Sequence, residues 1–128
     1  MRGNRLTAFK GEAFGANSFS HLKLLDLTDN ELGYLFPSSF RVHIHLLELH
    51  LGQNKLSVFP GELIIALKEL EFLNLTGNQL KNIDELDFAR LPKLRELHLA
   101  KNIIESISES AFHNSTQLQV ISVPYIIN

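Results

Sequence analysis

The chain of 128 residues contains no cysteine. Without cysteine, this segment has no disulfide bond and no cysteine-ligated metal site. No apolar run approaches the roughly 18 residues that a membrane-spanning helix requires, and the N-terminus lacks the charged start and apolar stretch of a secretory signal peptide. We therefore expect no direct membrane insertion of this segment.

An excess of charge of one sign is also missing. The chain has 12 basic and 14 acidic residues, mixed along its length, for a net charge of −2. Nucleic-acid binding needs a clustered basic face, so we expect no nucleic-acid partner. Apolar residues make up 45% of the chain, which supports a packed core and argues against disorder. The length fits one domain.

What the sequence does contain is a repeated string of leucine and asparagine. The stretch "LKLLDLTDNEL" (22–32) returns as "LLELHLGQNKL", "LEFLNLTGNQL" and "LRELHLAKNII". A leucine stands eight, five and three residues before the asparagine in every copy. The asparagines are 24 residues apart (54 − 30, 78 − 54 and 102 − 78), and they are Asn30, Asn54, Asn78 and Asn102.

The spacing of these leucines predicts a coil of short strands. A period of 24 is not a multiple of seven, so it does not fit a coiled coil. We infer that each L-x-L centre is a strand with both leucines inward, paired in parallel with the next copy ~4.8 Å away. The asparagine amides are expected to form a ladder that bonds backbone groups at the bend, although turn preference alone is an alternative reading.

This L-x-x-L-x-L-x-x-N-x-L pattern resembles the 24-residue typical leucine-rich repeat of extracellular animal proteins such as Toll-like receptors, Slit-type proteins and neuronal adhesion receptors. The resemblance implies an α/β repeat solenoid, a curved horseshoe segment with a parallel sheet on its concave face and turns or short helical segments on its convex face. We expect a single array over residues 1–128. Its units are a partial repeat 1–21, the repeats 22–45, 46–69, 70–93 and 94–117, and a partial repeat 118–128.

Ten residues after the markers, phenylalanines are expected to stack as a second spine on the far side, with Ile64 replacing one of them. They are Phe14, Phe40, Phe88 and Phe112. The chain departs from the family in lacking cysteine-rich caps, and His43 and Ser115 stand where neighbouring copies have leucine. We expect a piece of a longer ectodomain; a complete small cytosolic protein is the alternative.

The resemblance implies that a protein ligand docks on the concave face. Phe72 should project from the middle strand as an anchor, although a lone exposed apolar residue is ordinary. Glutamates around it favour a partner with a basic, partly apolar patch. The expected ligand-binding residues are Asp26, Glu48, His50, Glu71, Phe72, Asn74, Arg95, Glu96 and His98.

Other chemistry finds little support in the sequence. His50 and His98 lie ~10 Å apart on this geometry, too far for shared zinc bonds of ~2.0–2.1 Å unless both rings lean across Asn74. Ser122 beside His98 is the only nucleophile–base suggestion, and nothing supplies an oxyanion hole or a phosphate-binding loop. We therefore expect no metal, no cofactor and no enzyme activity.

Two N-x-[ST] triplets mark candidate glycosylation sites, at Asn74 and Asn114. A glycan on Asn74 would obstruct the concave face. The preferred hypothesis is an extracellular or cell-surface recognition module of a receptor or adhesion protein, with a homodimer as one arrangement open to it. An intracellular repeat scaffold and a targeting domain of a larger enzyme are the alternatives.

Overall fold

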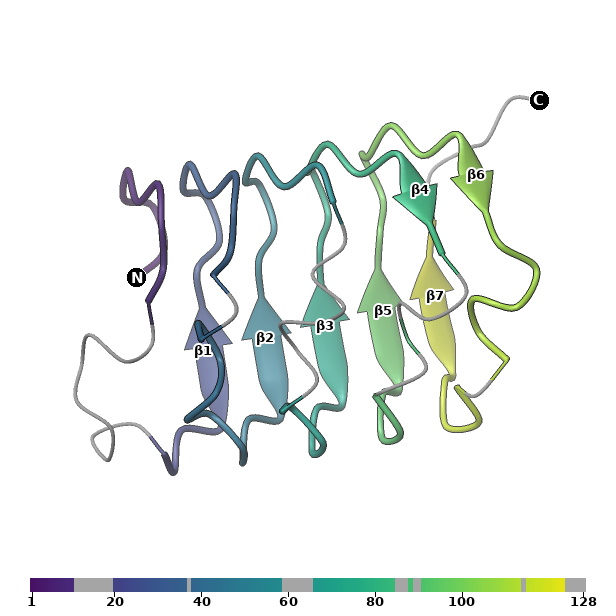
Figure 1. Cartoon of the computed structure of the whole chain (residues 1–128), viewed down its shortest axis with the longest axis horizontal. Coiled ribbons are helices and arrows are strands. Elements are labelled where there is room, and N and C mark those ends of the chain that lie inside the picture. The colour runs from purple at the N-terminus through teal and green to yellow at the C-terminus, as the bar shows by residue number, and fades with distance from the viewer. Residues whose placement is uncertain are drawn as a thin grey trace.

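The structure, a computed structural model, describes residues 1–10, 20–36, 38–58, 66–84, 88, 91–113 and 115–123. The chain rises through a strand, turns, crosses behind it and returns beside it, coil after coil (Figure 1). This is the expected solenoid of parallel strands. The strands are β1 (Leu24–Asp26), β2 (Glu48–His50), β3 (Phe72–Asn74), β4 (Asn82–Ile83), β5 (Glu96–His98), β6 (Ser106–Ile107) and β7 (Val120–Ser122).

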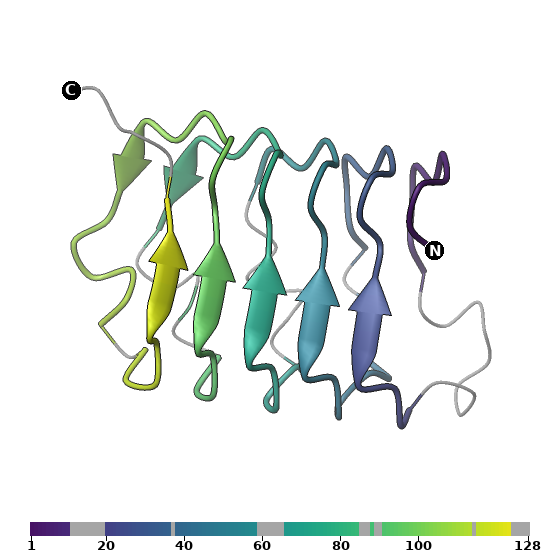
Figure 2. The same ribbon diagram turned by 180° about the vertical axis from the view of Figure 1, so that it is seen from behind.

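One parallel sheet forms the front of the solenoid, with strand order β1-β2-β3-β5-β7. Figure 2 shows these strands side by side and pointing the same way. Leu25 pairs with Leu49, and Leu49 with Leu73, and the same offset of 24 continues through β5 and β7. Equivalent residues of successive copies therefore form rows across the sheet.

The inward leucines build the core because side chains alternate between the two faces of a strand. Leu49, Leu73 and Leu97 in the middle strands are fully buried, and each such leucine contributes about 1.5–3 kcal/mol on burial. At the far end, Ile121 of β7 is 44% exposed, since no described strand lies beyond it. The core is thus complete in the middle of the array and open at the last strand.

The far side differs from the expected pattern in one respect. It carries a second, two-stranded parallel pair, β4 with β6, and no helix is formed in the residues that are described. Of the expected spine, Phe88 stacks on Phe112, with ring centroids 5.1 Å apart, whereas Phe40 packs at a tilt of 31° against Phe9, which is not a spine position, at 5.7 Å between ring centroids. The other two spine positions, Phe14 and Ile64, lie outside the described residues. No described helix is long and apolar enough to cross a membrane.

Each marker asparagine joins its own coil to the one before it. The Asn54 amide nitrogen donates to the carbonyl oxygens of Leu51 and Leu27, both at 3.0 Å. Its side-chain oxygen accepts the N–H of Leu32 at 3.0 Å. The same set of bonds recurs at Asn30, Asn78 and Asn102. The bend after each strand therefore leaves these backbone groups paired, as buried backbone requires.

The residue before each marker asparagine adopts a left-handed backbone conformation. The φ angles are 60° at Asp29, 53° at Gln53, 72° at Gly77 and 53° at Lys101. A side chain in this conformation costs roughly 1–2 kcal/mol, and glycine avoids that cost. Only one of the four copies has glycine there, so three copies carry local strain.

Candidate functional site on the outer sheet face

The outward residues of the sheet form two rows, which we call the outer sheet face. The first row lies at the start of the strands, and the second lies at their ends. In order across the sheet, the rows are Leu24, Glu48, Phe72, Glu96 and Val120, and then Asp26, His50, Asn74, His98 and Ser122. The structure thus brings the strand residues of the expected ligand-binding set together on one surface, and Glu71 and Arg95 directly precede β3 and β5.

Phe72 lies between two imidazole rings rather than projecting alone. Its ring centroid is 4.8 Å from that of His50 in β2 and 5.2 Å from that of His98 in β5. The rings are tilted by 31° and 39°, and the Phe72 side chain is half-buried. We call His50, Phe72 and His98 the ring row. Both imidazole rings lie against the Phe72 ring.

A glutamate of the same strand holds each imidazole. The Nε2 atom of His50 lies 3.2 Å from a carboxylate oxygen of Glu48, and that of His98 lies 3.4 Å from Glu96. When Nε2 carries hydrogen it donates to that carboxylate. Residues two apart in a strand share a face, so the Glu-Leu-His triplet itself places the two groups together. The triplet occurs at 48–50 and again at 96–98, which is the sequence signal for the ring row.

In β1 and β3, which lack histidine, the side chain in the second row instead accepts a hydrogen bond from the turn that follows the strand. The Asp26 carboxylate accepts the Thr28 N–H at 2.9 Å, and the Asn74 side-chain oxygen accepts the Thr76 N–H at 2.9 Å. Such side-chain-to-backbone bonds stabilise turns. Partial burial of Asp26 acts to raise the pKa of its carboxyl group. The hydrogen bonds from Thr28 and the nearby side chains of His50 and Arg2 lower this pKa by more, so it lies below its ordinary value.

A depression of about 310 Å³ lies where the chain enters the strands. Glu71, which has no side-chain hydrogen bond or ion pair with any described residue, lines it beside the exposed Arg95. Three carboxylates and one guanidinium give its lining a formal charge of −2 (1 − 3). The lining residues are Leu47, Glu48, Glu71, Phe72, Arg95, Glu96 and Gln119.

Metal binding gains no support from the described part of the chain, where no group of three or more histidine or acidic side chains is placed to hold an ion. His98 and Ser122 are register partners in β5 and β7, as their positions in the repeat imply. Of the two candidate glycosylation sites, Asn74 lies on the outer sheet face, and Asn114 lies outside the described residues.

Comparison with known proteins agrees with this architecture. A sequence profile of the leucine-rich repeat family matches residues 20–80. Asporin of Bos taurus is 30% identical over 109 residues, which are 85% of this chain and 28% of asporin. The glycosylated form of the Drosophila Toll–Spatzle complex superimposes with a TM-score of 0.77 at 27% identity, covering 81% of this chain and 14% of that one.

A further solved structure, the TLR13–ssRNA13 complex, has a TM-score of 0.83 over 98% of this chain and 21% of that one. At 20% identity it shows likeness of fold alone. Two relatives carry enzyme names. They are PH domain leucine-rich repeat-containing protein phosphatase 1 of Homo sapiens (35% identical, over 62% of this chain and 5% of that protein) and adenylate cyclase of Schizosaccharomyces pombe (30% identical, 96% and 7%).

This chain spans 28% or less of the length of each of these proteins. The profile, the relatives and the solved structures all point to the same repeat that the 24-residue spacing defines. The chain belongs to the leucine-rich repeat family.

Proposed function

We propose that this module binds a protein partner on the outer sheet face, with the ring row at the centre of the contact. The observation that carries the proposal is the position of Phe72 between His50 and His98. An aromatic side chain held by its neighbours loses little conformational freedom on binding, and aromatic residues are frequent anchors of protein interfaces. Asporin carries no enzyme name, and the Toll structure is a complex with Spatzle.

The charges around the ring row favour a partner segment with basic and apolar side chains. Glu48 and Glu96 lie on either side of Phe72 in its row, and Glu71 precedes it. Opposite charge across an interface steers association and fixes orientation. Arg95 supplies one positive group at the rim, where an acidic residue of the partner could pair with it. We therefore expect an arginine or lysine next to an aliphatic or aromatic residue in the bound segment.

An extracellular or cell-surface setting is the one we propose for this contact. It is supported by the likeness to asporin and to the Toll structure. An intracellular scaffold remains the alternative, since the enzyme-named relatives show the same repeat in other settings. The protein partner can also be a second copy of this chain, which would form a homodimer. Sedimentation of the protein at increasing concentration tests whether such a dimer forms.

Selection from a displayed peptide library tests the proposal without a known partner. The protein is made in bacteria, so that no glycan on Asn74 covers the face. We expect the recovered peptides to combine basic and apolar residues and to lose binding to Phe72→Ala. Tyr34→Ala is the matched control, since Tyr34 is an exposed aromatic outside the sheet. Peptides that bind Phe72→Ala as well as the original protein would contradict the proposal.

Single-stranded RNA belongs in the same assay. The sequence argument against nucleic acid is not supported by the comparisons, because the TLR13 structure is a complex with RNA. The lining charge of −2 in the depression opposes phosphate groups, which need basic partners. We expect no retention of RNA on the immobilised protein at about 0.15 M salt; RNA binding that Phe72→Ala abolishes would replace the protein partner with a nucleic acid.

A further inference from the structure

The ring row contains two side chains of the one type whose charge ordinarily changes between pH 5 and pH 8. Histidine is that type. His50 and His98 are half-buried on the outer sheet face, and both rings lie against Phe72. A change of pH within this range therefore alters the charge at the centre of the proposed contact rather than at its rim.

The surroundings of each imidazole suit its charged form. The Nε2 atom of His50 lies 3.2 Å from a carboxylate oxygen of Glu48, and that of His98 lies 3.4 Å from Glu96. Both nitrogens of an imidazolium carry hydrogen, so protonation turns each contact into an ion pair. A cation over an aromatic face is also attracted to it, and Phe72 offers a face to both rings. Protonation thus adds positive charge at positions that the strands already fix.

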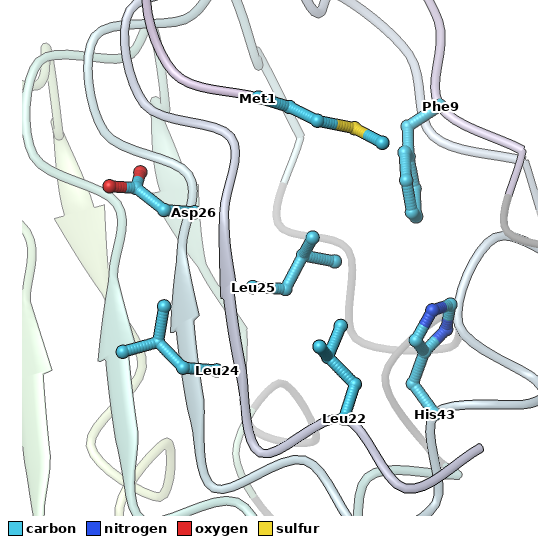
Figure 3. Close-up of a pocket in the computed structure, with 7 residues that line it drawn as sticks. All are labelled: Met1, Phe9, Leu22, Leu24, Leu25, Asp26 and His43. Carbon is cyan, nitrogen blue, oxygen red and sulfur yellow. The ribbon is translucent and has the colours of Figure 1, made fainter. Parts of the chain in front are cut away.

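The neighbouring strands add one more charged group. Asp26 projects from β1 on the side opposite to Leu25 (Figure 3), and it is the register partner of His50. The pKa of Asp26 lies below its ordinary value, so its carboxylate stays negative through this pH range. The other strands that pair with β2 and β5 are β3 and β7, and neither contains a charged residue. No cation of these strands therefore opposes protonation of His50 or His98.

The charge of the outer sheet face follows from these groups. With both imidazoles neutral, its two rows carry a formal charge of −3 (0 − 3), from Asp26, Glu48 and Glu96. With both protonated the charge is −1 (2 − 3), and the two glutamates are paired with imidazolium groups. Glu71 and Arg95, which line the depression at the start of the strands, have opposite charges. Acidification therefore removes most of the negative charge that a basic partner would meet.

We propose that acidification releases the partner from the outer sheet face, with His50 and His98 as the switch. This inference rests on the proposed function, because it requires a bound segment with basic and apolar residues. The added charges repel the basic groups of that segment and occupy the carboxylates that would bind them. One exposed ion pair changes affinity by about threefold, so the loss of two weakens binding by about tenfold.

Titration calorimetry at pH 7.5 and pH 5.5 tests the switch. The probe is a peptide of about 12 residues, recovered from the displayed library at pH 7.5, with blocked ends and without histidine, aspartate or glutamate, so that its own charge is constant. The original protein should bind it about tenfold more weakly at pH 5.5. His50→Gln and His98→Gln, each alone, should reduce this factor to about threefold, and the double variant should remove it.

His113→Gln is the matched control, since His113 is an exposed histidine outside the sheet, and it should keep the tenfold factor. Every variant retains the buried His43, so any loss of folded protein at pH 5.5 affects all of them alike. Equal affinity of the original protein at the two pH values, or a tenfold factor that survives in the double variant, would overturn the switch but leave the docking face. Peptides that bind Phe72→Ala unchanged would remove the docking face and the switch together.

Discussion

The ring centroid of Phe72 lies 4.8 Å from that of His50 on the neighbouring strand. His98 takes the same place on the other side, and each imidazole contacts a glutamate two residues earlier. Because strand pairing fixes the spacing of the three side chains, the row is formed before any partner arrives. Such preorganisation reduces the ordering cost of association.

Removing one ladder amide should destabilise the whole array. Asn54→Ala leaves the Leu32 N–H without its side-chain partner, and it removes one of the two asparagine amides that donate to the carbonyl oxygens of Leu27 and Leu51. A buried backbone group left unpaired costs about 1–3 kcal/mol, and with the two lost bonds to the carbonyls we expect a total loss of about 2–4 kcal/mol in the free energy of unfolding. Urea denaturation measures it.

Asn82→Ala is the matched control for that experiment. Asn82 is exposed, and its side-chain oxygen only accepts a hydrogen bond from the Ser106 hydroxyl. Its removal should change the free energy of unfolding by less than about 0.5 kcal/mol. Equal losses in the two variants would contradict the structural role assigned to the ladder.

Glycine should stabilise the strained bends. Lys101 has a φ of 53° and an exposed side chain, so Lys101→Gly removes a steric cost without removing buried contacts. We expect a gain of about 0.5–1 kcal/mol in the free energy of unfolding, smaller than the full strain because glycine is more flexible when unfolded. Thermal and urea unfolding check it. A destabilised Lys101→Gly would show that the left-handed conformation carries no such cost.

The stability of the protein should depend on pH through His43. Its pKa is lowered by burial, so the unfolded chain binds a proton more readily than the folded one. Above about pH 6.5, the ordinary pKa of histidine, His43 is neutral in both the folded and the unfolded chain, and the protein has its full stability. That stability is lost as the pH falls from there through the folded-state pKa of His43.

His43→Leu isolates this effect. The variant should be about 1 kcal/mol more stable at pH 7.5, because it removes a buried nitrogen without a partner, and its advantage should grow between pH 7 and pH 5. Urea titrations of both proteins at each pH give the difference. An advantage that stays constant across this range would exclude His43 as the source.

Part of this structure follows directly from the sequence. The 24-residue spacing of Asn30 and Asn54 predicts the parallel register of Leu25 with Leu49, because each coil must return to the same position. Burial of the inward leucines follows from the alternation of a strand. These are properties of one repeat copied along the chain.

The remaining features depend on neighbouring copies that differ. The ring row forms because Phe72 in β3 lies between strands that carry histidine, His50 in β2 and His98 in β5. A repeat pattern does not specify the orientation of these three rings. The β4–β6 pair and the left-handed bends likewise depend on backbone detail that leucine spacing does not encode. Gly3 and Gly77, which directly precede Asn4 and Asn78, are the glycines with a left-handed backbone among the described residues.

The most direct test of the proposed docking face is the affinity of one selected basic and apolar peptide, measured by titration calorimetry. We predict that Phe72→Ala weakens it about 30-fold, as loss of an interface anchor worth about 2 kcal/mol would, while Tyr34→Ala leaves it unchanged and both variants keep their urea midpoints. Equal affinity of the peptide for Phe72→Ala and for the original protein would contradict the account.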